Sequence, residues 1–498
     1  MKVGLGSAGV RAVKWSAIST VSRFGLQLTA QVVLTRLLGP ENYGLFGIGM
    51  MVLTLSSFLS NFGFAWNLLH KKDVEPEDIR FTFTWQVVIG LVTTLAVWLL
   101  APFIASYFRQ DKVVPVIQWL SLTCLISAAS ATASNLLQRE LKFRITGIVQ
   151  VASYAIGYIA VGIPMAYMGF GVYSLVTAWL VQATVALVGS YGACPHAIRP
   201  LFHYKGSANA FGLGGMVFST NIVNWFLNNI DRVLIGRLLS THVLGLYSAA
   251  YNLATMPNTL LLGALQTSFM AVASKMSDDR SRLQKAYLEI LSTIWTLLFP
   301  LFVVMAVLSY DLVQIIYGAQ WSDTGWALGL LFLGMPAYVS WGVSTPVLWN
   351  SNRKSYECLL QIPIIVVGGL MMYLLIPRGI LFAAAATSLL LVMRMVVITG
   401  AALKALDLNL LALAKPFSRG AALAIMGGGA ASLGPVLFGR HGLPVPSLLI
   451  GGFAGMTVLG AIVLLAPRTI GAGPQVMLMR FFPKLRTVWK LEPVALSE

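Results

Sequence analysis

Long apolar stretches, separated by short polar segments, dominate the pattern along this chain. Residues 145–198 contain no Lys, Arg, Asp or Glu, and the same holds for residues 42–70 and 243–274. An apolar run of about 20 residues is long enough to cross a bilayer as a helix. The pattern therefore predicts fourteen membrane-spanning helices. They cover residues 12–36, 44–69, 81–107, 114–137, 146–168, 171–193, 212–238, 243–273, 287–309, 324–349, 358–376, 380–402, 418–438 and 446–466.

The composition agrees with an all-α integral membrane protein. Hydrophobic residues make up 57% of the 498 residues and charged residues only 10%, whereas soluble domains carry about 25% charged residues. A net charge of +17 would suit a nucleic-acid-binding protein, but a chain this apolar excludes that class. Cys124, Cys194 and Cys358 lie far apart and form no CxxC pair, which excludes a disulfide framework or a zinc site as an organising feature.

Basic residues are distributed unevenly between the two sides of the predicted topology. With fourteen spans both termini lie on one side, whose tails and loops carry 25 of the 34 Lys and Arg residues, while the opposite loops carry five. Loops rich in Lys and Arg remain in the cytoplasm. We therefore expect both termini in the cytoplasm, where the basic loops would also attract anionic membrane lipids.

An internal repeat divides the chain into two similar halves. Residues 36–46 (RLLGPENYGLF) and 237–247 (RLLSTHVLGLY) match at a constant offset of 201 residues. Six predicted spans separate the two copies, so both halves have the same orientation. Parallel repeats imply a pseudo-two-fold axis along the membrane normal and a substrate path between the halves. We expect an N-lobe at 1–205, a C-lobe at 206–403, two additional helices in 404–467 and a basic cytoplasmic tail at 468–498.

Two polar stripes in the predicted spans coincide under this repeat. Members of each stripe recur every three or four residues and therefore share one helix face. The first stripe holds Ser16, Thr20, Arg23 and Gln27, and the second holds Asn221, Asn224, Asn228 and Asp231. The repeat superposes Thr20, Arg23 and Gln27 on Asn221, Asn224 and Asn228, in that order. Ionisable groups inside a bilayer usually face a cavity or a partner, so we expect these six residues to line a substrate-binding cavity. Hydrogen bonds that only join helices are the alternative.

Charged residues at the ends of spans are candidates for a gate or for ion coupling. They are Asp231, Arg36, Arg237, Arg232 and Arg394. Asp231 would either pair with Arg36 or Arg23 from the other half or carry a coupling proton. Arg36 and Arg237 each lie at the C-terminal end of their helix, where the macrodipole also favours a cation, so capping is the structural alternative. Arg394 could instead extend its guanidinium to the membrane interface.

Motifs for catalysis do not occur in the sequence. There is no GxxxxGK[ST], HExxH or GxSxG segment. The predicted external loops are short and carry few carboxylates, such as Glu41, Asp111, Asp311 and Asp323. We therefore expect neither an enzyme nor a resident metal or cofactor, with coupling to H⁺ or Na⁺ left open. A structural subunit of a larger complex is another alternative.

Four segments resemble a known family of transporters. They are LTRLLGPENYGLF at 34–46, NFGF at 61–64, QRELKFR at 138–144 and NIDRVLIGR at 229–237. Together they resemble Wzx-type polysaccharide exporters of the multidrug/oligosaccharidyl-lipid/polysaccharide flippase superfamily. The resemblance implies two six-helix lobes around a central, often cationic cavity. It also implies movement of undecaprenyl-diphosphate-linked oligosaccharide repeat units across the bacterial inner membrane by alternating access, for surface polysaccharide biosynthesis.

The resemblance leaves two other cargoes open. Fourteen spans also resemble the lipid II flippase branch, and drug/cation antiporters share the superfamily fold. The scarcity of intramembrane carboxylates argues against an antiporter. The implied partners are a polyprenyl-diphosphate-linked oligosaccharide and the polymerase or export machinery, and not a nucleic acid. Because a guanidinium binds phosphate oxygens through two parallel hydrogen bonds, Arg23 is the first choice for a diphosphate contact.

Overall fold

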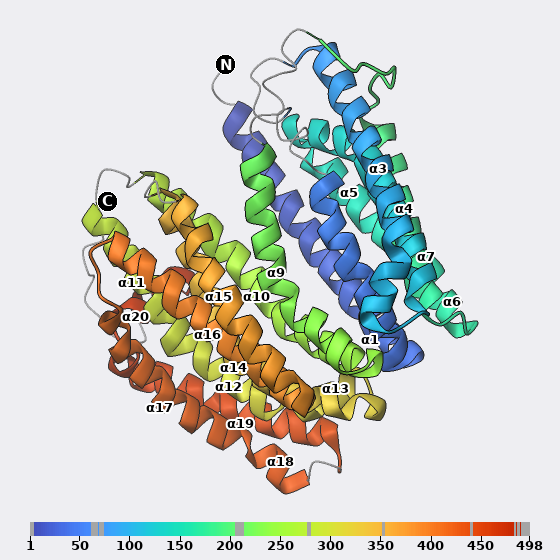
Figure 1. Ribbon diagram of the computed structural model, residues 1–498. Coiled ribbons are helices and arrows are strands. Elements are labelled where there is room, and N and C mark those ends of the chain that lie inside the picture. Colours follow the sequence, from blue (N-terminus) through green and yellow to red (C-terminus); the bar gives the residue numbers. More distant parts are fainter. Residues whose placement is uncertain are drawn as a thin grey trace. The chain divides into compact units, whose positions relative to one another are not determined.

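The computed structural model describes residues 4–60, 68, 74–204, 214–275, 280–350, 354–438, 442–482, 485 and 489. All regular secondary structure in these residues is helical (Figure 1), which confirms the predicted fold class. A bilayer offers no water to backbone N–H and C=O groups, so a helix, which pairs them within one segment, is the favoured structure. The chain divides into two compact units, Met1–Gly245 and Leu246–Glu498.

Helices α1 to α9 and the first turn of α10 form the first unit. They are α1 (Gly4–Ser60), α3 (Pro76–Phe108), α4 (Val113–Arg139), α5 (Phe143–Tyr154), α6 (Ile163–Tyr167), α7 (Val172–Ala193), α9 (Gly214–Leu238) and α10 (Thr241–Lys275). The π-helix η1 (Ala155–Gly162) joins α5 to α6. Helix α4 packs against α1, α3 and α7, and α1 also packs against α5.

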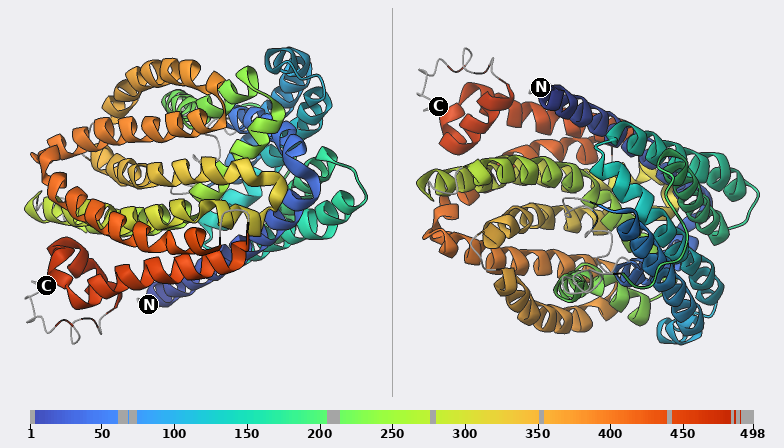
Figure 2. Two further views of the ribbon diagram at one scale, coloured as in Figure 1. Left: turned by 90° about the horizontal axis from the view of Figure 1, so that it is seen from below. Right: turned by 90° about the horizontal axis from the view of Figure 1, so that it is seen from above.

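The remaining helices form the second unit, whose long members run side by side (Figure 2). They are α11 (Arg280–Thr293), α12 (Phe299–Val307), α13 (Ser309–Ile316), α14 (Ser322–Asn350), α15 (Lys354–Leu375), α16 (Ile380–Ala405), α17 (Ala414–Ala431), α18 (Leu433–Phe438), α19 (Pro444–Leu465) and α20 (Ala472–Phe481). The π-helix η2 (Ile294–Leu298) joins α11 to α12, and short 3₁₀ turns join several others. Helix α14 makes its largest contact with α16.

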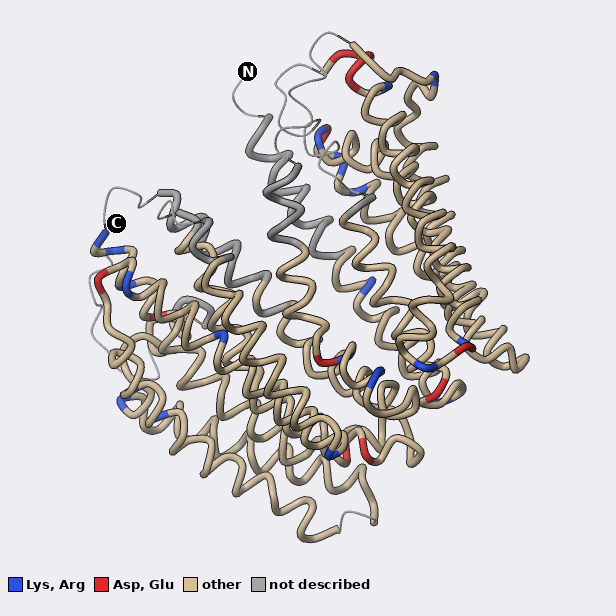
Figure 3. The backbone as a smooth tube through the Cα atoms, viewed as in Figure 1, with Lys and Arg blue, Asp and Glu red and all other residues tan. Residues whose placement is uncertain are grey.

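Ten helical segments are long and apolar enough to cross a membrane, counted over the described residues. They coincide with ten of the fourteen predicted spans. The other four predictions, 12–36, 44–69, 212–238 and 243–273, fall on α1, α9 and α10, which are helical in their described parts; as membrane spans they remain predictions. Charged residues gather near the helix ends, and the stretches between them are nearly uncharged (Figure 3).

The sequence repeat corresponds to a reciprocal helix crossing inside the first unit. Helix α1 is kinked at Gly39, whose φ of 72° and ψ of 171° are not helical, and the repeat partner of this kink is the break between α9 and α10. A Cβ added at Gly44 would lie 1.8 Å from the carbonyl oxygen of Thr241, and a Cβ at Gly245 would lie 1.8 Å from that of Pro40. Since residues 40 and 241, and 44 and 245, are both 201 apart, the contact has local two-fold symmetry.

Compactness and the repeat divide the chain at different points. The predicted lobe boundary follows residue 205, whereas the first compact unit extends to Gly245 and includes α9, which packs against α1 and α3. The lobes defined by the repeat remain a prediction. In the segment 468–498, predicted to be a tail, α20 packs against α11, and Trp489 is buried next to Leu423 and Ile470.

The segment after α7, residues 195–204, lies along the first half of α3, and we call it the linker. Trp85 Nε1 donates to the carbonyl of Phe202 at 3.2 Å, and the Tyr204 hydroxyl donates to the buried carboxylate of Asp78. Burial and the nearby Asp78 carboxylate both raise the pKa of Tyr204. His196 is half-buried against Phe83, and this burial lowers its pKa.

The two additional helices, α17 and α19, are part of the packed second unit. A Cβ at Gly420 of α17 would lie 1.9 Å from the carbonyl of Trp295, so only glycine permits this approach to η2. The hydroxyl of Ser447 in α19 donates to Asp311 Oδ2 at 2.6 Å. Asp311 therefore does not lie on an exposed loop as predicted. It is 2% exposed in the first turn of α13, where it anchors α19.

Candidate functional site

The seam between α1 and α5 brings the central arginine of the first stripe against a polar partner. Arg23 Nη1 donates to Gln150 Oε1 at 3.4 Å. Two turns earlier, the Arg144 guanidinium lies over the Trp15 ring at 4.9 Å. Because residue numbers increase in the same direction along both helices, α1 and α5 run parallel. The predicted topology requires this direction, because the first and fifth spans are an even number of membrane crossings apart.

Beyond Arg23 the seam becomes apolar and closed. The rings of Tyr154 and Tyr158 stack at 4.5 Å with an interplanar angle of 11°, and both rings pack with Ala30 and Leu34 of α1. Arg23 is half-buried and Thr20 is exposed. The guanidinium therefore lies where an open, polar part of the seam meets a closed, aromatic part. Its partner Gln150 was missed by sequence reasoning, although an amide in an otherwise apolar span is a usable signal.

The second stripe lies on α9, against the later part of α1. Trp225 Nε1 donates to Thr54 Oγ1 at 3.1 Å, while Asn224 and Asn228 are half-buried. The side chain of Asn221 lies outside the described residues. The expectation that the two stripes face one another across a cavity, and that Gln27 belongs to that cavity, remains a prediction.

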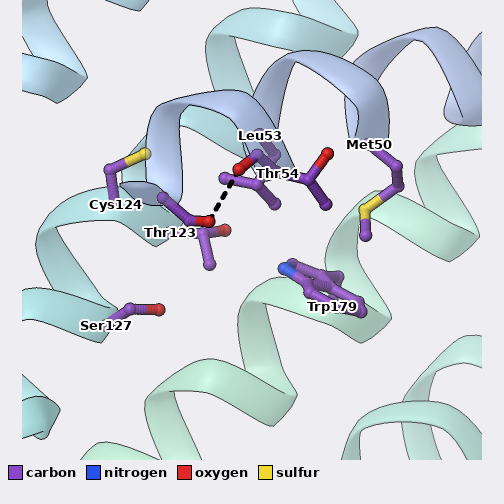
Figure 4. A pocket seen from close by; sticks show the side chains of 8 residues that line it. Met50, Leu53, Thr54, Thr123, Cys124, Ser127 and Trp179 are labelled. Carbon is purple, nitrogen blue, oxygen red and sulfur yellow. Dashed lines mark hydrogen bonds between the residues drawn. The ribbon is translucent and has the colours of Figure 1, made fainter. Parts of the chain in front are cut away.

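A small internal cavity adjoins this α1–α9 contact. It has a volume of about 140 Å³ and is lined by Thr54, Thr123, Ser127 and Trp179, among others (Figure 4). Trp179 Nε1 and Thr123 Oγ1 are buried and have no hydrogen-bond partner among the described residues. A cavity of this size has room for a water molecule that would satisfy such groups. We assign it no substrate, because its volume is too small for a sugar chain.

The candidate gate residues of the first unit have different surroundings. Asp231 is 4% exposed and accepts a hydrogen bond from the backbone N–H of Arg232 at 2.8 Å. Arg237 Nη1 donates to the Tyr107 carbonyl at 2.7 Å, and its guanidinium lies 5.3 Å from the Tyr107 ring. Arg237 thus caps the C-terminal end of α3, where a helix favours cations, and it also lies in the last turn of its own helix, α9. Arg36, its repeat partner, is exposed on α1.

Arg394 is enclosed in the second unit by three helices. Its side chain is 1% exposed, its Nη2 donates to Gln361 Oε1 at 3.2 Å, and its guanidinium lies 3.8 Å from the centre of the Trp341 ring. A desolvated cation–π contact contributes about 2 kcal/mol. The guanidinium therefore does not extend to the membrane interface. Instead, Arg394 joins α16 to α14 and α15.

A comparison of the sequence with models of protein families gives a match. A family model described as "Polysaccharide biosynthesis protein" matches residues 33–325, more than half of the chain. The chain belongs to this family. The matched range begins just before the LTRLLGPENYGLF segment and includes all four segments on which the resemblance rests. Arg23 and Arg394 lie outside it.

Individual proteins named for polysaccharide biosynthesis resemble this chain over about two thirds or more of its length. Lipopolysaccharide biosynthesis protein WzxC of Escherichia coli (strain K12) is 25% identical over 373 residues, covering 73% of this chain and 75% of that protein. Succinoglycan biosynthesis transport protein ExoT of Rhizobium meliloti (strain 1021) is 27% identical over 340 residues, covering 68% and 67%.

Solved structures share the fold. Lipid II flippase MurJ in an inward closed conformation gives a TM-score of 0.71 at 15% identity, covering 91% of this chain and 99% of that one. An inward-facing multidrug resistance MATE family transporter gives 0.60 at 13% identity, covering 80% and 98%. With the ten apolar helices, these findings make the chain a multi-pass bacterial membrane protein of the MurJ/MATE fold.

Proposed function

We propose that this chain is a flippase that moves undecaprenyl-diphosphate-linked oligosaccharide repeat units across the bacterial inner membrane by alternating access. The observation that carries the proposal is the match to the polysaccharide biosynthesis family over residues 33–325 on a fold like that of a lipid flippase. The named relatives belong to lipopolysaccharide and succinoglycan biosynthesis. Transport of a precursor, without catalysis, is the role that such a membrane fold suits.

Arg23 is the residue we propose for the diphosphate. It lies roughly 14 Å along the helix from Lys14 and roughly 20 Å from Arg36, at 1.5 Å per residue, so the headgroup regions are far from its Cα. Keeping a charge at this depth costs a few kcal/mol. A diphosphate would offset this cost through two-point hydrogen bonding, and Gln150 holds the guanidinium when no cargo is bound. Thr20, Gln27, Asn224 and Asn228 would serve the sugar hydroxyls.

Orientation and partners complete the proposal. Both termini would lie in the cytoplasm, as the asymmetry of basic residues predicts, and the cargo would be passed to a polymerase or export complex. Labelling of single introduced cysteines tests the orientation. Positions near Arg139 and Arg282 should react only from the cytoplasm, and positions near Asp111 and Arg378 only from outside. A C-terminus accessible from outside would contradict the fourteen-span topology.

Leaflet-resolved analysis of lipid-linked sugars tests the function. Deletion of the gene should cause polyprenyl-diphosphate oligosaccharides to accumulate in the inner leaflet. An unchanged lipid pool together with altered drug efflux would favour an antiporter, and accumulation of lipid II would favour a lipid II flippase, which the fold likeness to MurJ keeps as the second candidate.

Point variants test the assignment of Arg23. Arg23→Ala should abolish export with normal membrane insertion, and Arg23→Lys should retain part of it, because the charge survives while the planar fork is lost. Arg23→Gln is the decisive variant, since an amide can replace the hydrogen bond to Gln150 but cannot bind phosphate through charge. Export by Arg23→Gln at the parental rate would show that Arg23 only joins α1 to α5.

A further inference from the structure

Part of α1 and two turns at one end of the first unit line a second cavity, which we call the loop pocket. Its volume is about 510 Å³, within the roughly 300–1,000 Å³ typical of ligand pockets. Residues 41–45 of α1, the turn between α3 and α4, and the turn between α6 and α7 contribute its lining. The side chains that matter below are Glu41, Asn42, Asp111, Lys112, Phe170 and Tyr173.

The α6–α7 turn supplies two aromatic rings to the wall of the loop pocket. Phe170 lies between Gly169 and Gly171, whose φ angles of 83° and 55° fall in the region that favours glycine. Phe170 is 51% exposed and Tyr173 is 40% exposed. Aromatic residues at a membrane surface usually contact lipid headgroups. These two instead share a pocket with three charged side chains, which indicates an aqueous ligand site.

The polar side chains of the loop pocket offer mostly acceptors. Lys112 Nζ lies 3.2 Å from Glu41 Oε1. Asp111 makes no ion pair or side-chain hydrogen bond among the contacts of the described residues. Asn42 uses its Nδ2 on the carbonyl of Leu38 at 2.7 Å, which leaves its Oδ1 to accept. The pocket therefore suits a ligand with several hydroxyl donors.

These groups discriminate between classes of ligand. Two carboxylates would repel a phosphate, and the ammonium of Lys112 next to Glu41 would repel a bare divalent cation. A sugar satisfies every group, because its hydroxyls donate to carboxylates and accept from Lys112 while its C–H faces pack on the aromatic rings. We propose that the loop pocket binds an uncharged sugar unit of the cargo. This inference rests on the proposed function and places sugar recognition on the side opposite the predicted cytoplasmic termini.

Binding of free sugar to the full-length chain in nanodiscs tests the proposal. The probe is the oligosaccharide repeat unit released from the host's own surface polysaccharide, measured by calorimetry and saturation-transfer NMR, with inorganic pyrophosphate as the anionic comparison. Tyr173→Ala and Asp111→Asn should each weaken binding about five- to tenfold, the change expected for losing one such contact. Tyr167→Ala is the matched control, because Tyr167 is 70% exposed near the same turn but does not line the pocket.

The outcomes separate this proposal from the proposed function. Saturable binding of the free repeat unit, weakened by the two pocket variants and unchanged in Tyr167→Ala, supports a sugar site. Absence of binding, equal affinity in all variants, tighter binding of pyrophosphate, or binding only when the sugar is attached to polyprenyl diphosphate overturns it. If a deletion strain accumulates no lipid-linked oligosaccharide although the free sugar binds, only the flippase function fails. If the deletion strain does accumulate lipid-linked oligosaccharide but the free sugar does not bind, only the loop-pocket proposal is rejected.

Discussion

Replacing Gly44 by alanine should destabilise the first unit through the reciprocal crossing. The new Cβ would lie 1.8 Å from the Thr241 carbonyl oxygen, whereas a close carbon–oxygen contact needs about 3.3 Å. The helices must therefore separate by about 1.5 Å. Overpacking of this kind costs about 3 kcal/mol, and the better helix propensity of alanine returns about 1 kcal/mol. The net loss of about 2 kcal/mol should lower Tm by about 4–8 °C for a unit of this size.

The local two-fold symmetry of the crossing extends this prediction to a second glycine. Gly245→Ala should have the same effect, since its Cβ meets the Pro40 carbonyl at the same distance of 1.8 Å. The Tm of the double variant should fall by less than the sum of the two single decreases, because helices that have already separated make room for the second methyl group. Thermal unfolding of the purified chain, followed by size-exclusion chromatography, measures all three. Gly25→Ala on the same helix is the control, since a Cβ there has no neighbour within 4 Å.

An equal Tm for Gly44→Ala and Gly25→Ala would refute the reasoning. So would a large difference between Gly44→Ala and Gly245→Ala, since the two residues make the same contact in reverse. Strict additivity in the double variant would show that the two close approaches are independent, and the crossing would then not act as one contact.

Three further predictions follow from buried groups. Arg394→Ala should destabilise the chain by about 3 kcal/mol, because it removes a cation–π contact of about 2 kcal/mol and a buried hydrogen bond of about 1 kcal/mol. Arg394→Lys should recover only part of this, since an ammonium lacks the planar face that stacks on Trp341. Parental Tm in Arg394→Ala would contradict both. Asp231→Asn should reduce polysaccharide export at normal expression, and full export with unchanged pH dependence would remove both its pairing and its proton-carrying role. Because burial lowers the pKa of His196, its neutral form stabilises the linker above the ordinary pKa of about 6.5. This stability is lost as pH falls through the lowered pKa, so amide exchange of residues 195–204 should accelerate in acid, and His196→Phe should remove that dependence.

For the polar stripes, the sequence predicted the helix face of a side chain but not its contact partner. The spacing of Arg23 on its helix is a local property, and it assigns the side chain to one face of that helix. Its partner, Gln150, is 127 residues away, and nothing in either segment specifies that contact. The same holds for Arg237. Its place in the last turn of its own helix predicted a cap there, and packing alone decides that its hydrogen bond goes to a carbonyl of α3.

The amino-acid sequence by itself determined the helical class, most of the spans and the internal repeat, because apolar length and periodicity are properties of each segment alone. Membrane insertion depends on those properties whatever the neighbours are. Only the tertiary structure decided that Gly44 and Gly245 meet in a reciprocal contact, that Arg394 is enclosed by Trp341 and Gln361, and that part of α1 and two separate turns form the loop pocket. These are contacts between distant segments. They depend on the van der Waals fit and hydrogen bonding between helices, which the apolar pattern of a single helix does not encode.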